Sequence, residues 1–222
     1  MAISKDILRR LGEQMSRGEV ILFTGAGFSH GATDRHGVAI PQVKRLKEEI
    51  WDLIWPGQPG VDDSSLGDTY AAALTEAGNA LKELMRRRLT VLPQSVTESH
   101  ELWLSMPWRR AYTLNIDNLE DAAARAYDLP RRISAVSGLV RSLPLGTGAD
   151  LLFVHLNGTL DDLPDVTFTD PQYGRRQAQG SALYDQLAAD LIASRSYSSV
   201  RNYASPCFGS TSHFEMTGEV VV

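Results

Sequence analysis

A short apolar run followed at once by a glycine-rich turn constrains this chain more than any other feature. The run is Val20–Thr24, and the turn that follows reads Gly25-Ala26-Gly27-Phe28-Ser29. A bounded run of this kind is typical of a strand buried in a parallel sheet, although the pattern alone leaves a buried helix open. The glycines let the backbone turn sharply and approach a ligand closely. Open α/β sheets bind nucleotides at such turns, but tight structural turns use the same residues.

Composition narrows the class of protein. The 222 residues carry a net charge of −5, and Cys207 is the single cysteine. This length supports one globular domain without disulfides, and a four-cysteine zinc site is excluded, so we expect no metal and a reducing, cytoplasmic setting. The net negative charge argues against a protein that binds nucleic acid directly through a basic face. No apolar stretch approaches the roughly 20 residues that a membrane helix needs, so no membrane partner is expected.

Apolar runs and amphipathic segments alternate along the chain, which predicts an α/β fold: a Rossmann-like parallel sheet with helices on both faces. Residues 41–105 are predicted to form a small helical insertion. The strands are expected at residues 20–24, 110–114, 133–136 and 151–154, with a further short one at 167–169. The helices are expected at residues 4–17, 41–56, 66–76, 79–89, 96–104, 119–127 and 181–193.

The domain is predicted to occupy residues 1–194, because the composition changes after Ser194. Residues 195–222 are rich in Ser, Tyr, Asn and Gly, and no strong strand is predicted before Val220. An α/β domain normally continues with another apolar strand. We therefore expect an atypical tail, which is either an incomplete end of the domain or a segment foreign to it.

Two later strands also end in polar residues. Asn115 and Asp117 follow one strand, and His155 ends another. The carboxyl ends of parallel strands lie along one edge of a sheet, so these residues are expected to meet the glycine turn over a single crevice. Each has an alternative role: Asn115 and Asp117 can cap the next helix, and His155 can be a structural histidine. His100 is predicted to be structural, packed under the second of these segments.

Three segments, taken in order, resemble the sirtuin superfamily, and more closely the sirtuin-like domains of bacterial antiviral defence proteins. They are Thr24-Gly25-Ala26-Gly27-Phe28-Ser29, Thr113-Leu114-Asn115-Ile116-Asp117 and His155-Leu156-Asn157-Gly158. The resemblance extends over about residues 18–193. It implies an NAD-binding domain.

The departures from classical, deacetylating sirtuins are informative. Leu114 stands where those enzymes carry Gln, and the two Cys-x-x-Cys pairs of their zinc ribbon are absent from this sequence. Of their cofactor loop only Ile40-Pro41 is kept, and the late nucleotide contact has a loose counterpart at residues 209–212. These differences favour NAD hydrolysis over peptide deacylation.

The resemblance implies roles for individual residues, with NAD as substrate. Asn115 would hold ribose hydroxyls or a water, Asp117 would stabilise positive charge, and His155 would be a general base if its pKa is near neutral. These are the predicted catalytic residues. The predicted NAD-binding residues are Gly25, Ala26, Gly27, Ser29, Thr113, Asn115, Asp117 and Gly158.

The leading hypothesis is therefore an NAD+ hydrolase that acts as an effector in bacterial anti-phage defence. Such an effector is expected to work as a homo-oligomer or with a partner sensor protein or domain. Two alternatives remain. One is an NAD-dependent protein deacylase or ADP-ribosyltransferase, and the other is a catalytically silent NAD-binding module of a larger complex.

Overall fold

The computed structural model describes residues 5–60, 63–139, 149–179, 182–193, 196–200 and 220–221. Its centre is a parallel sheet in the order β3-β4-β2-β1-β5-β6, which confirms the predicted α/β, Rossmann-like class. The strands are β1 Val20–Thr24, β2 Arg110–Thr113, β3 Ile133–Ser137, β4 Leu151–His155, β5 Ser196–Val200 and β6 Val220–Val221. Every pairing between these strands is parallel.

The helices agree with most of the predicted segments. They are α1 Lys5–Ser16, α2 Val43–Ile54, α3 Leu66–Leu89, α4 Glu98–Ser105, α5 Leu119–Ala126, α6 Asp170–Gln179 and α7 Ala182–Ala193. Three short 3₁₀ turns complete the described elements: η1 Ala26–Ser29, η2 Pro93–Ser95 and η3 Leu160–Asp162. The two segments predicted at residues 66–76 and 79–89 adjoin in α3, which is interrupted by a non-helical conformation at Ala77 (φ −147°, ψ 39°).

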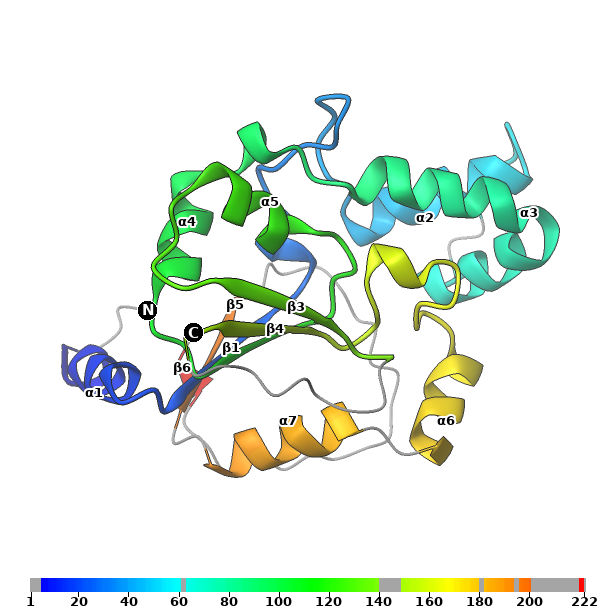
Figure 1. Ribbon diagram of the computed structural model, residues 1–222. Helices are drawn as coiled ribbons and strands as arrows, with labels where there is room; N and C mark the ends of the chain where they lie inside the picture. The colour runs from blue at the N-terminus through cyan, green and yellow to red at the C-terminus, as the bar shows by residue number, and fades with distance from the viewer. Residues whose placement is uncertain are drawn as a thin grey trace.

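Alternate residues along the strands face different layers, because successive side chains of a strand point to opposite faces. Val20, Leu22 and Phe153 belong to the larger core cluster, which also contains residues of α2, α3 and α5. Ile21 and Tyr112 belong to a smaller cluster with Leu183 of α7. Figure 1 shows α7 on one side of the sheet and α4 and α5 on the other, as predicted for helices on both faces.

The long connection between β1 and β2 alternates helices with loops. It contains α2, α3 and α4, and α2 and α3 pack side by side at one end of the molecule (Figure 1). Ser65 starts α3 with a capping box, in which its Oγ accepts from the Asp68 amide at 3.0 Å and Asp68 accepts from the Ser65 amide at 2.9 Å. These helices occupy the place of the insertion predicted at residues 41–105, whose status as a separate unit stays a prediction.

Three segments differ from the secondary structure that the sequence predicts: residues 167–169, helix α6 and strand β5. Residues 167–169 form no strand; they precede α6, and Gln172 Oε1 accepts hydrogen bonds from the Phe168 and Thr169 amides at 2.8 and 2.9 Å. After α7, β5 pairs with β1 although no strand was expected before Val220. The sequence pattern did not predict β5 because its sequence, Ser-Tyr-Ser-Ser-Val, lacks the apolar character of a central strand. Cys207 and residues 209–212 lie outside the described residues.

Helix α7 is fixed to the sheet by a buried carboxylate. Asp190 is 1% exposed, accepts a hydrogen bond from Tyr112 Oη at 2.6 Å and forms an ion pair with Arg110. Both partners lie on β2. In the described part of the chain, no helix is long and apolar enough to cross a membrane.

Candidate functional site

The three motifs meet at the carboxyl ends of neighbouring strands. β2 lies between β1 and β4, and Thr113 is the register partner of both Thr24 and His155. The segments that follow β1, β2 and β4 therefore begin at the same level of the sheet. This is the edge at which open α/β sheets bind ligands.

Side chains from these ends form one hydrogen-bonded group. Ser29 Oγ donates to Asp117 Oδ2 at 2.7 Å, and Asn115 Nδ2 donates to Ser29 Oγ at 3.1 Å. His155 contacts the carbonyl oxygen of Asn115 and the carboxylate of Glu120. We call this set the strand-end cluster. Its members are Ser29, Asn115, Asp117, Glu120 and His155.

Both carboxylate oxygens of Asp117 accept hydrogen bonds. Its Oδ1 accepts from the Leu119 amide at 3.2 Å and so caps α5, while Oδ2 accepts from Ser29. Burial and the nearby Glu120 charge together raise the pKa of Asp117 to about 6, against the lowering effects of the Ser29 hydroxyl, His155 and the Leu119 amide. Asn115 does not cap the helix, and it remains half-buried, so it is the member of the cluster best placed to meet a ligand.

His155 is 1% exposed, and both ring nitrogens have partners. The Asn115 carbonyl oxygen lies 2.9 Å from Nδ1, and Glu120 Oε1 lies 3.0 Å from Nε2. Burial by itself lowers the pKa of His155, but the Glu120 carboxylate, the Asn115 carbonyl and Asp117 outweigh it and raise the pKa to about 9. The condition attached to a general-base role for His155, a near-neutral pKa, is therefore not met, because a buried carboxylate stabilises the protonated ring.

Sequence reasoning missed Glu120. It is 2% exposed and lies in the first turn of α5, where an acidic residue is usually explained by the helix dipole. A usable signal existed, since Glu120 lies three residues after Asp117 and so can reach the same side of the helix start. Among the described residues, no group of three or more His, Cys, Asp or Glu side chains could hold a metal ion.

The glycine turn is open. Gly25 has an extended conformation (φ −141°, ψ −168°), and a Cβ added there would meet no described atom within 4 Å. Ala26 is exposed, and Gly25 and Gly27 are partly exposed. The first amides of a 3₁₀ turn such as η1 have no partner within the turn, so they are available to an anionic group.

Two other predicted NAD-binding residues shape the strand ends. Thr113 is 1% exposed, and its Oγ1 accepts from the Asn115 amide at 3.0 Å, which sets the bend after β2. Gly158 has φ +95°, and a Cβ there would crowd Asp162 and Leu139 at 3.2 and 3.3 Å. Both residues thus have structural reasons for their identity, and their contact with NAD stays a prediction.

No family model matches this chain. The chain is 22% identical over 190 residues to the NAD(+) hydrolase ThsA of Enterococcus faecium. The aligned region covers 85% of this chain and 38% of that protein, so the chain spans well under half of the length of this relative. The similarity is distant.

His100 supports the glycine turn from beneath. The Thr97 amide donates to its Nδ1 at 3.0 Å, so Nε2 carries the proton and donates to the Phe28 carbonyl at 2.8 Å. Burial lowers the pKa of His100, which keeps the ring neutral. His100 is structural, as predicted, but it lies under the first motif rather than the second.

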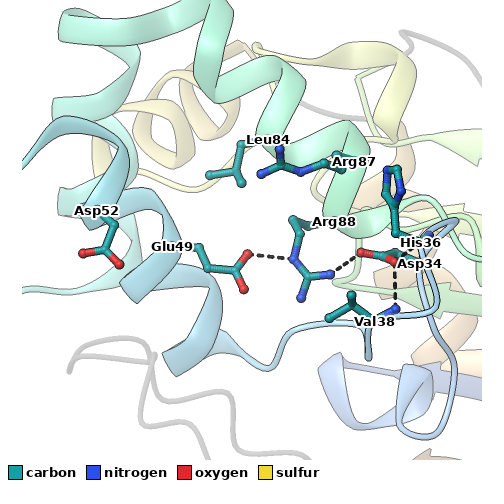
Figure 2. A pocket seen from close by; sticks show the side chains of 8 residues that line it. All are labelled: Asp34, His36, Val38, Glu49, Asp52, Leu84, Arg87 and Arg88. Atoms are coloured by element: carbon teal, nitrogen blue, oxygen red, sulfur yellow. Dashed lines mark hydrogen bonds and ion pairs between the residues drawn. The ribbon is translucent and has the colours of Figure 1, made fainter. Parts of the chain in front are cut away.

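A pocket of about 540 Å³ lies away from the strand ends, between α2, α3 and the turn at residues 33–39 (Figure 2). In Figure 2, Arg88 lies between Glu49 and Asp34 and forms ion pairs with both. Arg88 also donates to the Ala39 carbonyl at 3.0 Å. We call Asp34, Glu49 and Arg88 the helix-side cluster. The pocket is lined by Asp34, His36, Val38, Glu49, Asp52, Leu84, Arg87 and Arg88.

The buried polar groups of this pocket already satisfy one another. Asp34 Oδ1 accepts from the amides of His36 and Val38 at 2.9 and 3.0 Å, and its other oxygen binds Arg88. Burial raises the pKa of Asp34, but these amides and Arg88 outweigh that effect and lower it. The helix-side cluster therefore fixes the turn to α3 and offers little to a ligand, whereas the strand-end cluster borders an open turn.

Proposed function

We propose that this chain carries an NAD+ hydrolase domain, which cleaves the nicotinamide–ribose bond to give nicotinamide and ADP-ribose. The main support is the strand-end cluster, in which Ser29, Asn115 and Asp117 are hydrogen-bonded beside an open glycine turn. The distant similarity to the NAD(+) hydrolase ThsA supports the same activity. NAD is the substrate, and the reaction as proposed requires no metal ion.

Bond cleavage places positive charge on the ribose. The electron pair of the C1′–N bond leaves with neutral nicotinamide, and the ribose becomes an oxocarbenium-like cation, as in glycoside cleavage. A carboxylate close to that cation stabilises it in a site that excludes water. Asp117, with its pKa of about 6, is ionised at neutral pH and supplies that charge. Water then bonds to C1′ and loses a proton to the solvent or to a carboxylate.

The other predicted residues bind and orient the substrate. Gly25, Ala26 and Gly27 present backbone amides to the pyrophosphate, and Ser29 adds a hydroxyl contact. Asn115 holds the ribose hydroxyls or the attacking water, since its amide both donates and accepts hydrogen bonds. Each of these assignments belongs to the proposal.

The biological setting that we propose is bacterial anti-phage defence. A domain that destroys NAD would stop the metabolism of an infected cell, acting in the cytoplasm where NAD is abundant. The relative is a much longer protein than this chain, so a homo-oligomer or a partner sensor protein or domain is proposed to control the activity.

The decisive experiment measures the rate at which the purified chain releases nicotinamide from NAD, with chromatography to identify ADP-ribose. The Asn115→Ala variant should lose at least about 100-fold in rate, the usual cost of removing one oriented donor. Asn118→Ala is the matched control: Asn118 lies in the same loop and accepts from the Val91 amide at 2.8 Å. Its variant should keep the activity.

The same assay separates the alternatives. Release that requires an acylated peptide would indicate a deacylase, and transfer of ADP-ribose to protein would indicate a transferase. NAD binding by calorimetry without any release, alone or with candidate partners, would indicate the silent binding module. Equal rates in the wild type and in Asn115→Ala would refute the proposed site.

A further inference from the structure

The environment of His155 defines where its protons lie. Nδ1 is 2.9 Å from the Asn115 carbonyl oxygen, and a carbonyl oxygen can only accept a hydrogen bond, so Nδ1 carries a proton. Nε2 is 3.0 Å from Glu120 Oε1. Neither nitrogen is left to face a substrate, and the ring is 1% exposed.

Glu120 is as buried as its partner. It is 2% exposed and lies in the first turn of α5, which brings it from the segment after β2 to the end of β4. The other charged groups near His155 come from the same segment: Asp117 raises its pKa, and Asp121 on the next position of α5 also interacts with it. From β4 itself, Phe153 contributes an uncharged ring with its centroid 5.7 Å away.

The contacts of His155 lead directly to the predicted substrate-binding amide. His155 holds the backbone carbonyl of Asn115, and the side chain of the same residue donates to Ser29 Oγ at 3.1 Å. A change in the His155 ring would therefore move the residue that we propose to orient ribose or water. A small misplacement of such a group is costly to catalysis.

We infer that Glu120 and His155 form a positioning pair, which holds Asn115 in place and does not take a proton from the substrate. Glu120 fixes the ring, and the ring Nδ1–H fixes the Asn115 carbonyl. The inference rests on the proposed function for its catalytic meaning, while the pair itself is a feature of the fold. It assigns a role to Glu120, and it replaces the general-base role implied for His155.

The raised pKa of His155, about 9, agrees with this assignment. A general base must be unprotonated before the reaction, and at neutral pH a ring with this pKa is protonated. A positioning ring needs only its Nδ1 proton. The two roles therefore predict different responses to pH and to substitution.

The first test compares His155→Asn with His155→Ala, both in a Glu120→Gln background so that no buried carboxylate is left unpaired. The Asn side-chain amide places a donor near the position of Nδ1, so it can still hold the Asn115 carbonyl. We expect nicotinamide release at least tenfold faster in the Asn variant than in the Ala variant. Equal rates would overturn the inference, because neither side chain can act as a base.

The second test follows kcat from pH 6 to 10 together with the imidazole resonances in NMR spectra. In the wild type we expect the His155 resonance to titrate near 9, with kcat level from about pH 7 up to that pH. Above it kcat should fall, because the Glu120 carboxylate keeps the remaining ring proton on Nε2 and Nδ1 can no longer donate to the Asn115 carbonyl. In Glu120→Gln the midpoint should move down by at least about one unit, since the ion pair is lost. The fall in kcat above pH 9 should then disappear, because a Gln amide can donate to a neutral ring. Asp121→Asn is the control, and it should leave the midpoint nearly unchanged.

Other outcomes are equally decisive. A kcat that rises tenfold per pH unit toward 9, with the rise displaced to lower pH in Glu120→Gln, would identify His155 as a base and refute the inference. A wild-type chain that releases no nicotinamide at any pH would refute the proposed function alone. In that case the NMR titration still tests whether Glu120 and His155 form an ion pair. A His155 midpoint near its ordinary value in both the wild type and Glu120→Gln would show that they do not, and would overturn the inference.

Discussion

The strand-end cluster and the helix-side cluster are both buried groups of charged and polar side chains, yet they are built differently. In the helix-side cluster a guanidinium is enclosed by two carboxylates and a carbonyl, so each of its three nitrogens has an acceptor. In the strand-end cluster the buried pair of Glu120 and His155 supports Asn115, which remains half-buried beside an open turn. The two clusters therefore differ in one respect: only the buried network of the strand-end cluster ends at an accessible polar group.

Removing the cation of the helix-side cluster should have the largest effect, and the effect should be on stability. Arg88→Met leaves Asp34 buried without a counter-charge, whereas Glu49 keeps its ion pair with Arg45, so the free energy of unfolding should fall by about 3–5 kcal/mol. Urea denaturation measures this, and kcat of the remaining folded protein should not change. The neighbouring exposed Arg87, changed to Met, is the control and should alter neither quantity. A loss of kcat in Arg88→Met at full folding would contradict the separation of the clusters.

Removing the charge of Asp117 in the strand-end cluster should lower the activity and leave the stability nearly unchanged. Asp117→Asn should lower the rate of nicotinamide release by about 100-fold, because the positive ribose loses its carboxylate. The free energy of unfolding should change by no more than about 1 kcal/mol, since Asn can still accept from the Leu119 amide. The wild-type rate should also fall below about pH 6, where Asp117 becomes protonated, and this limb should be absent in the variant. Asp121→Asn should retain both the rate and the limb.

A methyl group at the glycine turn tests the open side of the strand-end cluster. Gly25→Ala fits the extended backbone and meets no described atom within 4 Å, so the fold should be retained. The new Cβ would occupy the approach to the pyrophosphate, and KM for NAD should rise at least tenfold, or about 1.4 kcal/mol.

The comparison for this variant is Gly158→Ala. Gly158 has φ +95° and close neighbours, so a Cβ there is strained and the free energy of unfolding should fall by roughly 1–2 kcal/mol. An unchanged KM in Gly25→Ala would place the phosphates elsewhere.

The smallest expected effect is that of the two buried histidines, His155 and His100, on stability. The two should change the stability with pH in opposite directions. The pKa of His155 is raised to about 9 from an ordinary value of 6.5, so its contribution to stability is complete below about 6.5 and is lost as the pH rises through 9. The pKa of His100 is lowered, so its contribution is present above 6.5 and is lost as the pH falls.

Thermal unfolding between pH 5 and 10 measures both effects. His155→Asn should flatten the alkaline loss of stability, and His100→Asn should leave that loss intact while it reduces the acid-side loss. Parallel pH profiles in the two variants would show that the carboxylate of Glu120 does not distinguish the histidines.

Local patterns predicted most of the fold. The apolar run Val20–Thr24, the glycine turn after it and the amphipathic helices agree with the structure because their formation depends on neighbours in the sequence. The break in α3 at Ala77 falls between the two helices that were expected there. Strand β5 and helix α6 were missed, the first because its sequence is polar and the second because Gln172 and Thr169 were not recognised as helix-start residues.

The sequence alone predicted that Ser29, Asn115, Asp117 and His155 lie at the strand ends, since parallel strands bring their carboxyl ends to one edge. Only the tertiary structure decided how those residues are charged and paired. Glu120 meets His155 across a separation of 35 residues, and Arg88 meets Asp34 across 54. The pKa of a buried group depends on the charges and dipoles that the fold places around it, and no local pattern specifies them. For that reason the sequence predicts that Asn115 and Asp117 lie at this edge, whereas it does not specify the charge of His155 or its contact with Glu120.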